Sequence, residues 1–443
     1  MGEAGIWGTA GATMLEIAMD REHRDVIAFL TDGVTLGGSA HGGLIRHQMS
    51  SLMGEVQRTT SFARRFGDVD EETIKELPDE VRAILFSTIH KRNDGLTFLA
   101  MPRSPCSRSL FMPKEIATTD AGSRGRALGL LIEAKDCLDA LETAVGWWPD
   151  CGAAQTVPLY TSADLNCLLH ACSLALAGVR DSMEMPGAEE RCLLRDAMYT
   201  SLAECQRLRE AIQDPTRSVK AGENQARVDE VVSLARKNRV ALDGAHIFVL
   251  SNVLRRPIIC HAPPDVEGGE SRHALTVPFR MSGIYLPLLW DAAETSPDPL
   301  VIVYTRGHFT ALSPVEPLTG SGVVAIPLYD SQRASLPVPY AAIASGNSDC
   351  WIGWAGLPPA HAGKAEELMV DISSRDCRDV LERYLTVTSN AHGLSAAMRV
   401  PAPELADKSG ATINTDDILE FYVQVLQKSI RKKLAECHDV VTI

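Results

Sequence analysis

Four short apolar segments near the middle of the chain constrain its fold most strongly. Turn residues separate these segments, which are GIYLPLLW (283–290), PLVIVYT (299–305), HFTALSP (308–314) and VVAIPLYD (323–330). Their length and β-branched content are typical of strands. The preceding part of the chain has mainly the apolar periodicity of helices. Helices followed by strands indicate an α+β, or mixed α/β, fold.

Three segments connect the helical part to these strands. TVPLYT (156–161) predicts a further strand, and residues 190–212 predict a helix. GAHIFVLSNVLRRPIICHA (244–262) predicts a helix that changes into a strand at Pro257. We interpret the polar segment 215–230 as a loop.

The length of 443 residues allows two or three domains. We expect a helical N-terminal region at 1–125, a central domain at 126–345 and a helical C-terminal extension at 346–443. Residues 11–33 resemble one ankyrin repeat, but no second copy follows at a period of about 33 residues. A plain helical hairpin and the last repeat of a longer array both remain open for this segment.

The charge and the cysteines limit the classes of partner. The net charge of −14 argues against nucleic acid or an anionic membrane as the main partner. The eleven cysteines form no CxxC pair and no cluster at zinc spacing, so we expect reduced thiols, no metal and a cytoplasmic or nuclear location. We also expect no secretory signal and no membrane-spanning helix.

Cys167 stands where a short polar turn becomes an apolar helix, in SADLNCLLHACSLALAGVRD (162–181). Unpaired N–H groups at the start of a helix favour a thiolate, so this position predicts a lowered thiol pKa. The same turn can direct N–H groups at a developing oxyanion. Cysteines at helix starts are more often buried packing residues, and this alternative stays open.

A nucleophilic cysteine needs a base, and three histidines are candidates. His170 lies on the same helix among apolar neighbours, which indicates packing. His246 is interpreted as a core or helix-surface residue. His308 opens a strand directly after the turn YTRG, so its ring is exposed on an anchored backbone. We therefore favour His308.

At these residues the chain resembles a known family. ADLNCLLHA resembles the Gly-Asp-Gly-Asn-Cys-Leu-Leu-His-Ala motif of the ovarian tumour (OTU) cysteine deubiquitinases. HIFVLSNVLRRPII (246–259) is similar to a helix–strand unit of the Cezanne and TRABID branch, and SGIYLPLLW and VYTRGHFTAL follow in the order of that branch. Upstream, residues 130–148 resemble the Leu-Ile-Glu helix of the branch. The resemblance implies that residues 126–345 form a catalytic domain with a papain-like core.

The resemblance also implies roles for individual residues. Cys167 would attack the isopeptide carbonyl, and His308 would act as general base and then general acid. Glu133 would orient His308, although a solvated helix carboxylate is the alternative for this position. The backbone N–H groups of Asp164 and Cys167 would form the oxyanion hole, and Asn166 would shape the turn.

Other residues near the motif test this interpretation. Cys172 lies on a different face of the helix and should be inert, and Trp147 and Trp148 should belong to the core. The chain has Ala163 and Leu165 where the family motif has glycines. If either position requires a positive φ, its side chain costs about 1–2 kcal/mol.

From these residues we expect a thiol-dependent hydrolase of isopeptide bonds in ubiquitin chains. Thiolate, imidazole and carboxylate suffice for acyl transfer, so no cofactor is required. The expected partners are ubiquitin or polyubiquitin, and the helical extensions are candidate surfaces for protein partners. Two alternatives are an inactive ubiquitin-binding scaffold and a protease for another ubiquitin-like modifier.

Overall fold

A computed structural model describes the chain over residues 89–99, 110–118, 144–148, 153, 155–162, 164–181, 192–212, 221–263, 281–316, 324–339, 375–389, 395–399, 426–427, 430–432 and 434. All of them belong to one compact unit, Thr88–Pro403 with Leu426–Ile443. The ankyrin-like segment 11–33 and Glu133 lie outside the described residues. The three-part division of the chain therefore stays a prediction.

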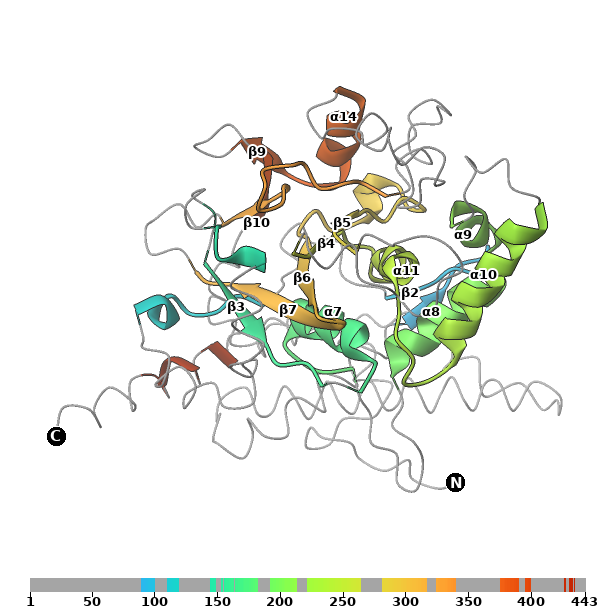
Figure 1. Ribbon diagram of the computed structural model, residues 1–443, viewed down its shortest axis with the longest axis horizontal. Helices are drawn as coiled ribbons and strands as arrows, with labels where there is room; N and C mark the ends of the chain where they lie inside the picture. Colours follow the sequence, from blue (N-terminus) through green and yellow to red (C-terminus); the bar gives the residue numbers. More distant parts are fainter. Residues whose placement is uncertain are drawn as a thin grey trace, which may run out of the picture. The chain divides into compact units, whose positions relative to one another are not determined.

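A five-stranded sheet forms the centre of this unit (Figure 1). Its strands, in spatial order, are β3 (Thr156–Leu159), β7 (His308–Pro314), β6 (Leu300–Thr305), β4 (Ile258–His261) and β5 (Gly283–Tyr285). β4 and β6 run parallel, and all other neighbouring pairs are antiparallel. These are the segments for which the sequence predicted strands, and their β-branched and aliphatic side chains are buried.

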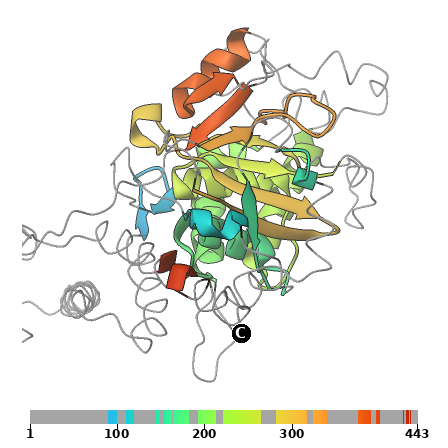
Figure 2. The same cartoon turned by 90° about the vertical axis from the view of Figure 1, so that its left-hand side faces the viewer.

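Helices cover one face of this sheet. α7 (Cys167–Ala177) packs against β6 and β7, and α11 (Gly244–Leu254) packs against β4 and β5. Figure 2 shows these helices behind the sheet. Every residue of α7 is buried, because CLLHACSLALA is apolar around nearly its whole circumference. The helix ends at Gly178, which adopts the left-handed conformation with φ 70°.

The helices between α7 and α11 differ from the prediction in two places. The helix predicted at 190–212 is broken at Cys205 into α8 (Leu193–Glu204) and α9 (Gln206–Ala211). The predicted polar loop at 215–230 is wrong for residues 221–230, because α10 spans Ala221–Arg236. Its buried stripe of Val228, Val231 and Ala235 is narrow, and the polar residues around it conceal the helical period.

A second sheet joins the C-terminal part of the chain to the central unit. β8 (Val324–Pro327), β10 (Ser395–Arg399) and β9 (Val387–Ser389) pair antiparallel in this order. Arg399 Nε donates to Asp298 Oδ1 at 2.8 Å, which fixes β10 to the core. The sequence predicted helices after residue 346. α14 (Arg375–Tyr384) is one, whereas β9 and β10 were not predicted.

The remaining described elements are short. β1 (Ile89–Lys91) and β2 (Thr97–Leu99) form a hairpin, and η1 (Lys114–Thr118) and η5 (Ala292–Glu294) are 3₁₀ helices. Within the described part of the chain, no helix is both long and apolar enough to cross a bilayer. The fold is α+β with a papain-like core, as the sequence predicted.

Candidate active site

Cys167 is the first residue of α7, and its side chain is buried, with 8% of the residue exposed. Burial raises the pKa of its thiol. The N–H groups of Phe309, Leu168 and Cys167 itself are directed at the sulfur and act in the opposite direction. The sequence predicted a lowered pKa for this thiol, and this prediction is wrong, although the N–H groups have an effect of the predicted sign. Burial outweighs it, so the resting thiol is neutral and needs a base.

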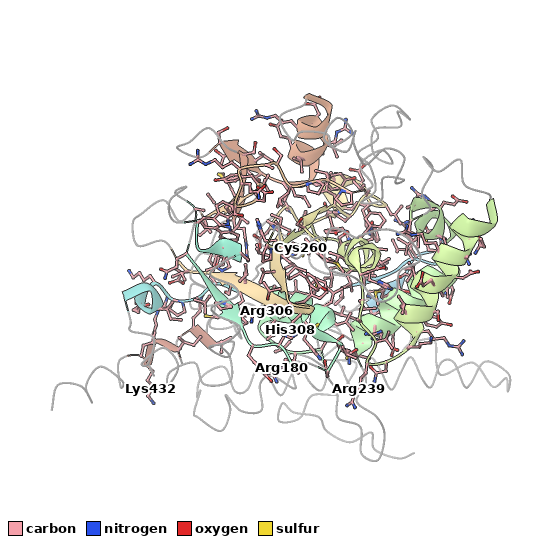
Figure 3. All side chains as sticks on the ribbon, in the orientation of Figure 1. Arg180, Arg239, Cys260, Arg306, His308 and Lys432 are labelled. Atoms are coloured by element: carbon pink, nitrogen blue, oxygen red, sulfur yellow. The ribbon has the colours of Figure 1, made fainter. Side chains whose placement is uncertain are left out.

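His308 is placed by the tight turn between β6 and β7. Arg306 and Gly307 have φ values of 49° and 83°, and Thr305 pairs directly with His308. Two successive residues with positive φ make the hairpin turn that matches the twist of the strands. The imidazole therefore sits half-buried at the start of β7, beside Arg306 (Figure 3).

Thr161 fixes the orientation of this imidazole. Its Oγ1 lies 2.7 Å from His308 Nε2 and 2.6 Å from the carbonyl oxygen of Phe309. The carbonyl can only accept, so the single hydroxyl proton is donated there. Nε2 must then be the donor to Thr161, and Nδ1 is left as the basic nitrogen of the neutral ring.

Phe309 links the two candidate catalytic residues, Cys167 and His308, through its backbone. Its N–H is directed at the Cys167 sulfur, and its carbonyl oxygen accepts from Thr161. The register of β3 and β7, continued two residues beyond Leu159, places Thr161 opposite Phe309. Because β3 has ended there, these backbone groups are available to side chains instead of to a strand partner. The sulfur and the imidazole thus flank the same residue of β7.

The turn before Cys167 is held by two contacts of the Asp164 carboxylate. Asp164 Oδ2 lies 3.0 Å from Nε2 of the buried His170, and Asp164 Oδ1 accepts from the N–H of Asn166 at 2.9 Å. Burial acts to raise the pKa of Asp164, but the contacts with His170 and Asn166 outweigh it and lower the pKa to about 2. His170 therefore has a structural role in this turn, in agreement with its interpretation as a packing residue.

Arg195 of α8 holds the same turn from the interior. Its guanidinium is buried and donates only to oxygen atoms of neutral groups, which are Asn166 Oδ1 and the carbonyl oxygens of Leu165, Leu234, Lys237 and Val240. Burial lowers the pKa of Arg195. Leu234 and Lys237 stand at the C-terminal end of α10, where the helix dipole favours a cation. Asn166 is fully buried in this network, as expected for a residue that shapes the turn.

Leu165 stands where the family motif has a glycine, and this departure affects the backbone of the turn. Its φ is 65°, in the left-handed region that favours glycine. The sequence analysis expected an energetic cost if this position required a positive φ, and Leu165 does adopt one. Its side chain therefore costs about 1–2 kcal/mol of stability. Ala163 lies outside the described residues. The oxyanion hole assigned to the N–H groups of Asp164 and Cys167 stays a prediction.

The other predicted residues take different places. Cys172 is fully buried, and burial strongly raises the pKa of its thiol, which agrees with an inert role. Trp148 is buried with its ring edge-on to His261, with 4.8 Å between the ring centroids. Glu133 lies outside the described residues, so its role stays a prediction. Among the described side chains, no group of three His, Cys, Asp or Glu residues could hold a metal ion.

The sequence analysis missed two residues of the site. Thr161 ends the predicted strand TVPLYT immediately before the motif, and the end of a strand beside a reactive turn was an available signal. Arg195 is a lone cation in the apolar stretch CLLRDAM, which is typical of a buried charge with a specific role. In both cases the partners are far away in the sequence.

Comparison with known proteins found a family match and several relatives. Residues 162–309 match the OTU-like cysteine protease family. The chain is 37% identical over 119 residues to ubiquitin thioesterase trabid of Drosophila melanogaster, which covers 24% of this chain and 15% of that protein. It is 30% identical over 198 residues to tumor necrosis factor alpha-induced protein 3 of Homo sapiens and of Macaca fascicularis, covering 40% of this chain and 24% of each relative. The chain thus spans at most 24% of the length of these relatives.

Proposed function

Residues 162–309 belong to the OTU family of cysteine proteases, and from this premise we propose that the chain is a cysteine-type deubiquitinase. Its substrate is ubiquitin joined by an isopeptide bond to a lysine side chain. The name of the similar Drosophila protein, ubiquitin thioesterase trabid, supports ubiquitin as the acyl donor. One observation carries the proposal. The N–H of Phe309 is directed at the Cys167 sulfur, and the residue directly before Phe309 is His308.

The first half of the reaction forms a thioester. His308 Nδ1 takes the proton from the Cys167 thiol, and the sulfur attacks the carbonyl carbon of the isopeptide bond. The carbonyl oxygen becomes an oxyanion, which the N–H groups of Asp164 and Cys167 stabilise. When the tetrahedral intermediate collapses, the C–N bond breaks, and His308 returns its proton to the departing lysine amine.

The second half restores the enzyme. Water attacks the thioester carbonyl and gives a proton to His308. When the C–S bond breaks, His308 returns this proton to the departing Cys167 sulfur and restores the neutral thiol, and the released carboxylic acid of ubiquitin loses its proton to solvent. Thr161 keeps Nε2 of the ring occupied throughout, so that Nδ1 faces the chemistry. Glu133, which lies outside the described residues, stabilises the imidazolium through its negative charge in this scheme. The raised pKa of the thiol makes proton transfer to His308 part of the reaction and not a resting condition.

The test uses a ubiquitin probe with a C-terminal electrophile, which traps a reactive thiol covalently. We expect one adduct on the unchanged chain, none on Cys167→Ala, and undiminished labelling of the matched control Cys172→Ala. Cys167→Ala should retain ubiquitin binding. Equal cleavage of ubiquitin chains by Cys167→Ala and the unchanged protein would defeat the assignment.

Matched probes built on other ubiquitin-like modifiers separate the alternatives. Labelling by another modifier but not by ubiquitin would identify a protease for that modifier. Ubiquitin binding without any adduct would identify a scaffold protein.

A further inference from the structure

Leu165 combines two unfavourable features in one residue of the active-site turn. Among the large hydrophobic residues that the structure describes, Leu165 alone is exposed, with 49% of its surface accessible to solvent. It is also held in the left-handed conformation, with φ 65°. A single exposed leucine is ordinary on a protein surface. An exposed leucine in a strained backbone conformation calls for an explanation, because glycine or asparagine would adopt that conformation more easily.

The neighbouring contacts impose this conformation on Leu165. On one side, Asp164 Oδ1 accepts from the N–H of Asn166 at 2.9 Å. On the other side, Arg195 Nε donates to Asn166 Oδ1 at 3.0 Å, and Arg195 Nη2 lies 3.4 Å from the Leu165 carbonyl oxygen. The backbone shape is therefore fixed by Asp164, Asn166 and Arg195, none of which contacts the Leu165 side chain in these bonds. A leucine does not stabilise the folded turn at this position, because its backbone is strained and its side chain is exposed. We therefore look to the exposed side chain for the role of this residue.

We propose that Leu165 is a specificity-determining residue that packs against the methylene chain of the acceptor lysine. This inference rests on the proposed function. Residue 165 is two positions before the nucleophile, so its Cα lies within about 7 Å of the Cα of Cys167. The acyl side of the scissile bond consists of two glycines, which offer no side chain to an apolar contact. The leaving side offers the lysine stem, whose methylene groups pack well on apolar surface.

Contact with the lysine stem would act on the leaving group and not on the acyl donor. Burying the exposed half of a leucine side chain against methylene groups is worth about five- to twentyfold in kcat/KM. The effect should be absent when the substrate lacks a lysine. This distinction separates Leu165 from residues that act on the thiol or on ubiquitin itself.

The experiment compares Leu165→Asn with the matched control Leu165→Met. Asparagine tolerates the left-handed conformation and removes the apolar surface, whereas methionine retains that surface. One substrate is ubiquitin joined through an isopeptide bond to a labelled lysine peptide. A second carries 2,3-diaminopropionate in place of the lysine and so lacks three methylene groups. The third reagent is ubiquitin with a C-terminal propargyl amide, which has no leaving lysine.

We expect Leu165→Asn to lower kcat/KM for the lysine substrate about five- to twentyfold, and to leave the diaminopropionate substrate and the labelling rate within about twofold of the parent. Leu165→Met should keep the lysine preference, and Leu165→Asn should melt no lower than the parent. Normal labelling together with unchanged cleavage of the lysine substrate by Leu165→Asn would overturn this inference alone. Failure of the unchanged chain to label would instead overturn the proposed function.

Discussion

The contacts of the Asp164 carboxylate with His170 and Asn166 should make the turn before Cys167 sensitive to charge and pH. The perturbation is Asp164→Asn, which keeps the size of the side chain and removes its charge. The Asp164 side chain is 17% exposed, and its pKa is about 2, against an ordinary value of 3.8. A folded-state pKa below the unfolded one stabilises the fold at every pH above about 4, and this contribution is lost as pH falls through about 2. At neutral pH it amounts to about 2 kcal/mol.

The assay is urea unfolding followed by tryptophan fluorescence, for which the buried Trp148 is a reporter. At pH 7, Asp164→Asn should lower the free energy of unfolding by about 2 kcal/mol, because the amide cannot satisfy both His170 and Asn166 as the carboxylate does. At pH 3 the difference from the parent should shrink to about half, since the unfolded parent is then largely protonated.

The control for this prediction is Asp229→Asn. Asp229 is exposed on α10, where its carboxylate accepts from Gln225 at 2.8 Å. This variant should change the free energy of unfolding by less than about 0.5 kcal/mol. A deficit for Asp164→Asn that is the same at pH 7 and pH 3, or no deficit at all, would refute the reasoning from the buried carboxylate.

Two further predictions concern other described residues. Thr161→Val removes the hydroxyl that binds His308 Nε2, so kcat should fall about tenfold while KM changes less than twofold. Thr161→Ser, which keeps the hydroxyl, should retain the kcat of the parent. Equal kcat values for the valine variant and the parent would contradict the positioning role of Thr161. Burial lowers the pKa of His261 to about 3. As the pH falls, His261 is therefore protonated in the unfolded chain before it is protonated in the folded protein. The free energy of unfolding of the parent should fall by up to about 1.4 kcal/mol per pH unit between pH 6 and 4. His261→Asn, which can still donate to a carbonyl, should flatten this slope in pH-dependent calorimetry; an unchanged slope would show that another group causes it.

Local signals in the sequence were sufficient to predict the strands and the hairpin that carries His308. The β-branched content of LVIVYT and the Arg306–Gly307 turn act through nearest neighbours in the chain, so they can be read without the fold. The position of Cys167 at the start of a helix is local in the same way. The motif around it was also specific enough to identify the family of residues 162–309.

Residues whose partners lie far away in the sequence needed the structure. β9 and β10 are strands because they can pair in one sheet with β8, and neither segment has a strong strand pattern of its own. α10 is a helix because its narrow apolar stripe finds a buried surface. Arg195 binds both the turn before Cys167 and the residues around the end of α10, through acceptors 29 to 45 positions away.

The sequence by itself determined the candidate residues of the site, because the position of Cys167, the choice of His308 among twelve histidines and the surrounding turn depend on short stretches of chain. The tertiary structure decided the protonation state of the Cys167 thiol in the resting protein. The helix start favours the Cys167 thiolate, yet the depth of burial raises the thiol pKa, and burial is a property of the packed fold. The same packing orients the His308 ring through Thr161 and holds Leu165 exposed two residues before Cys167.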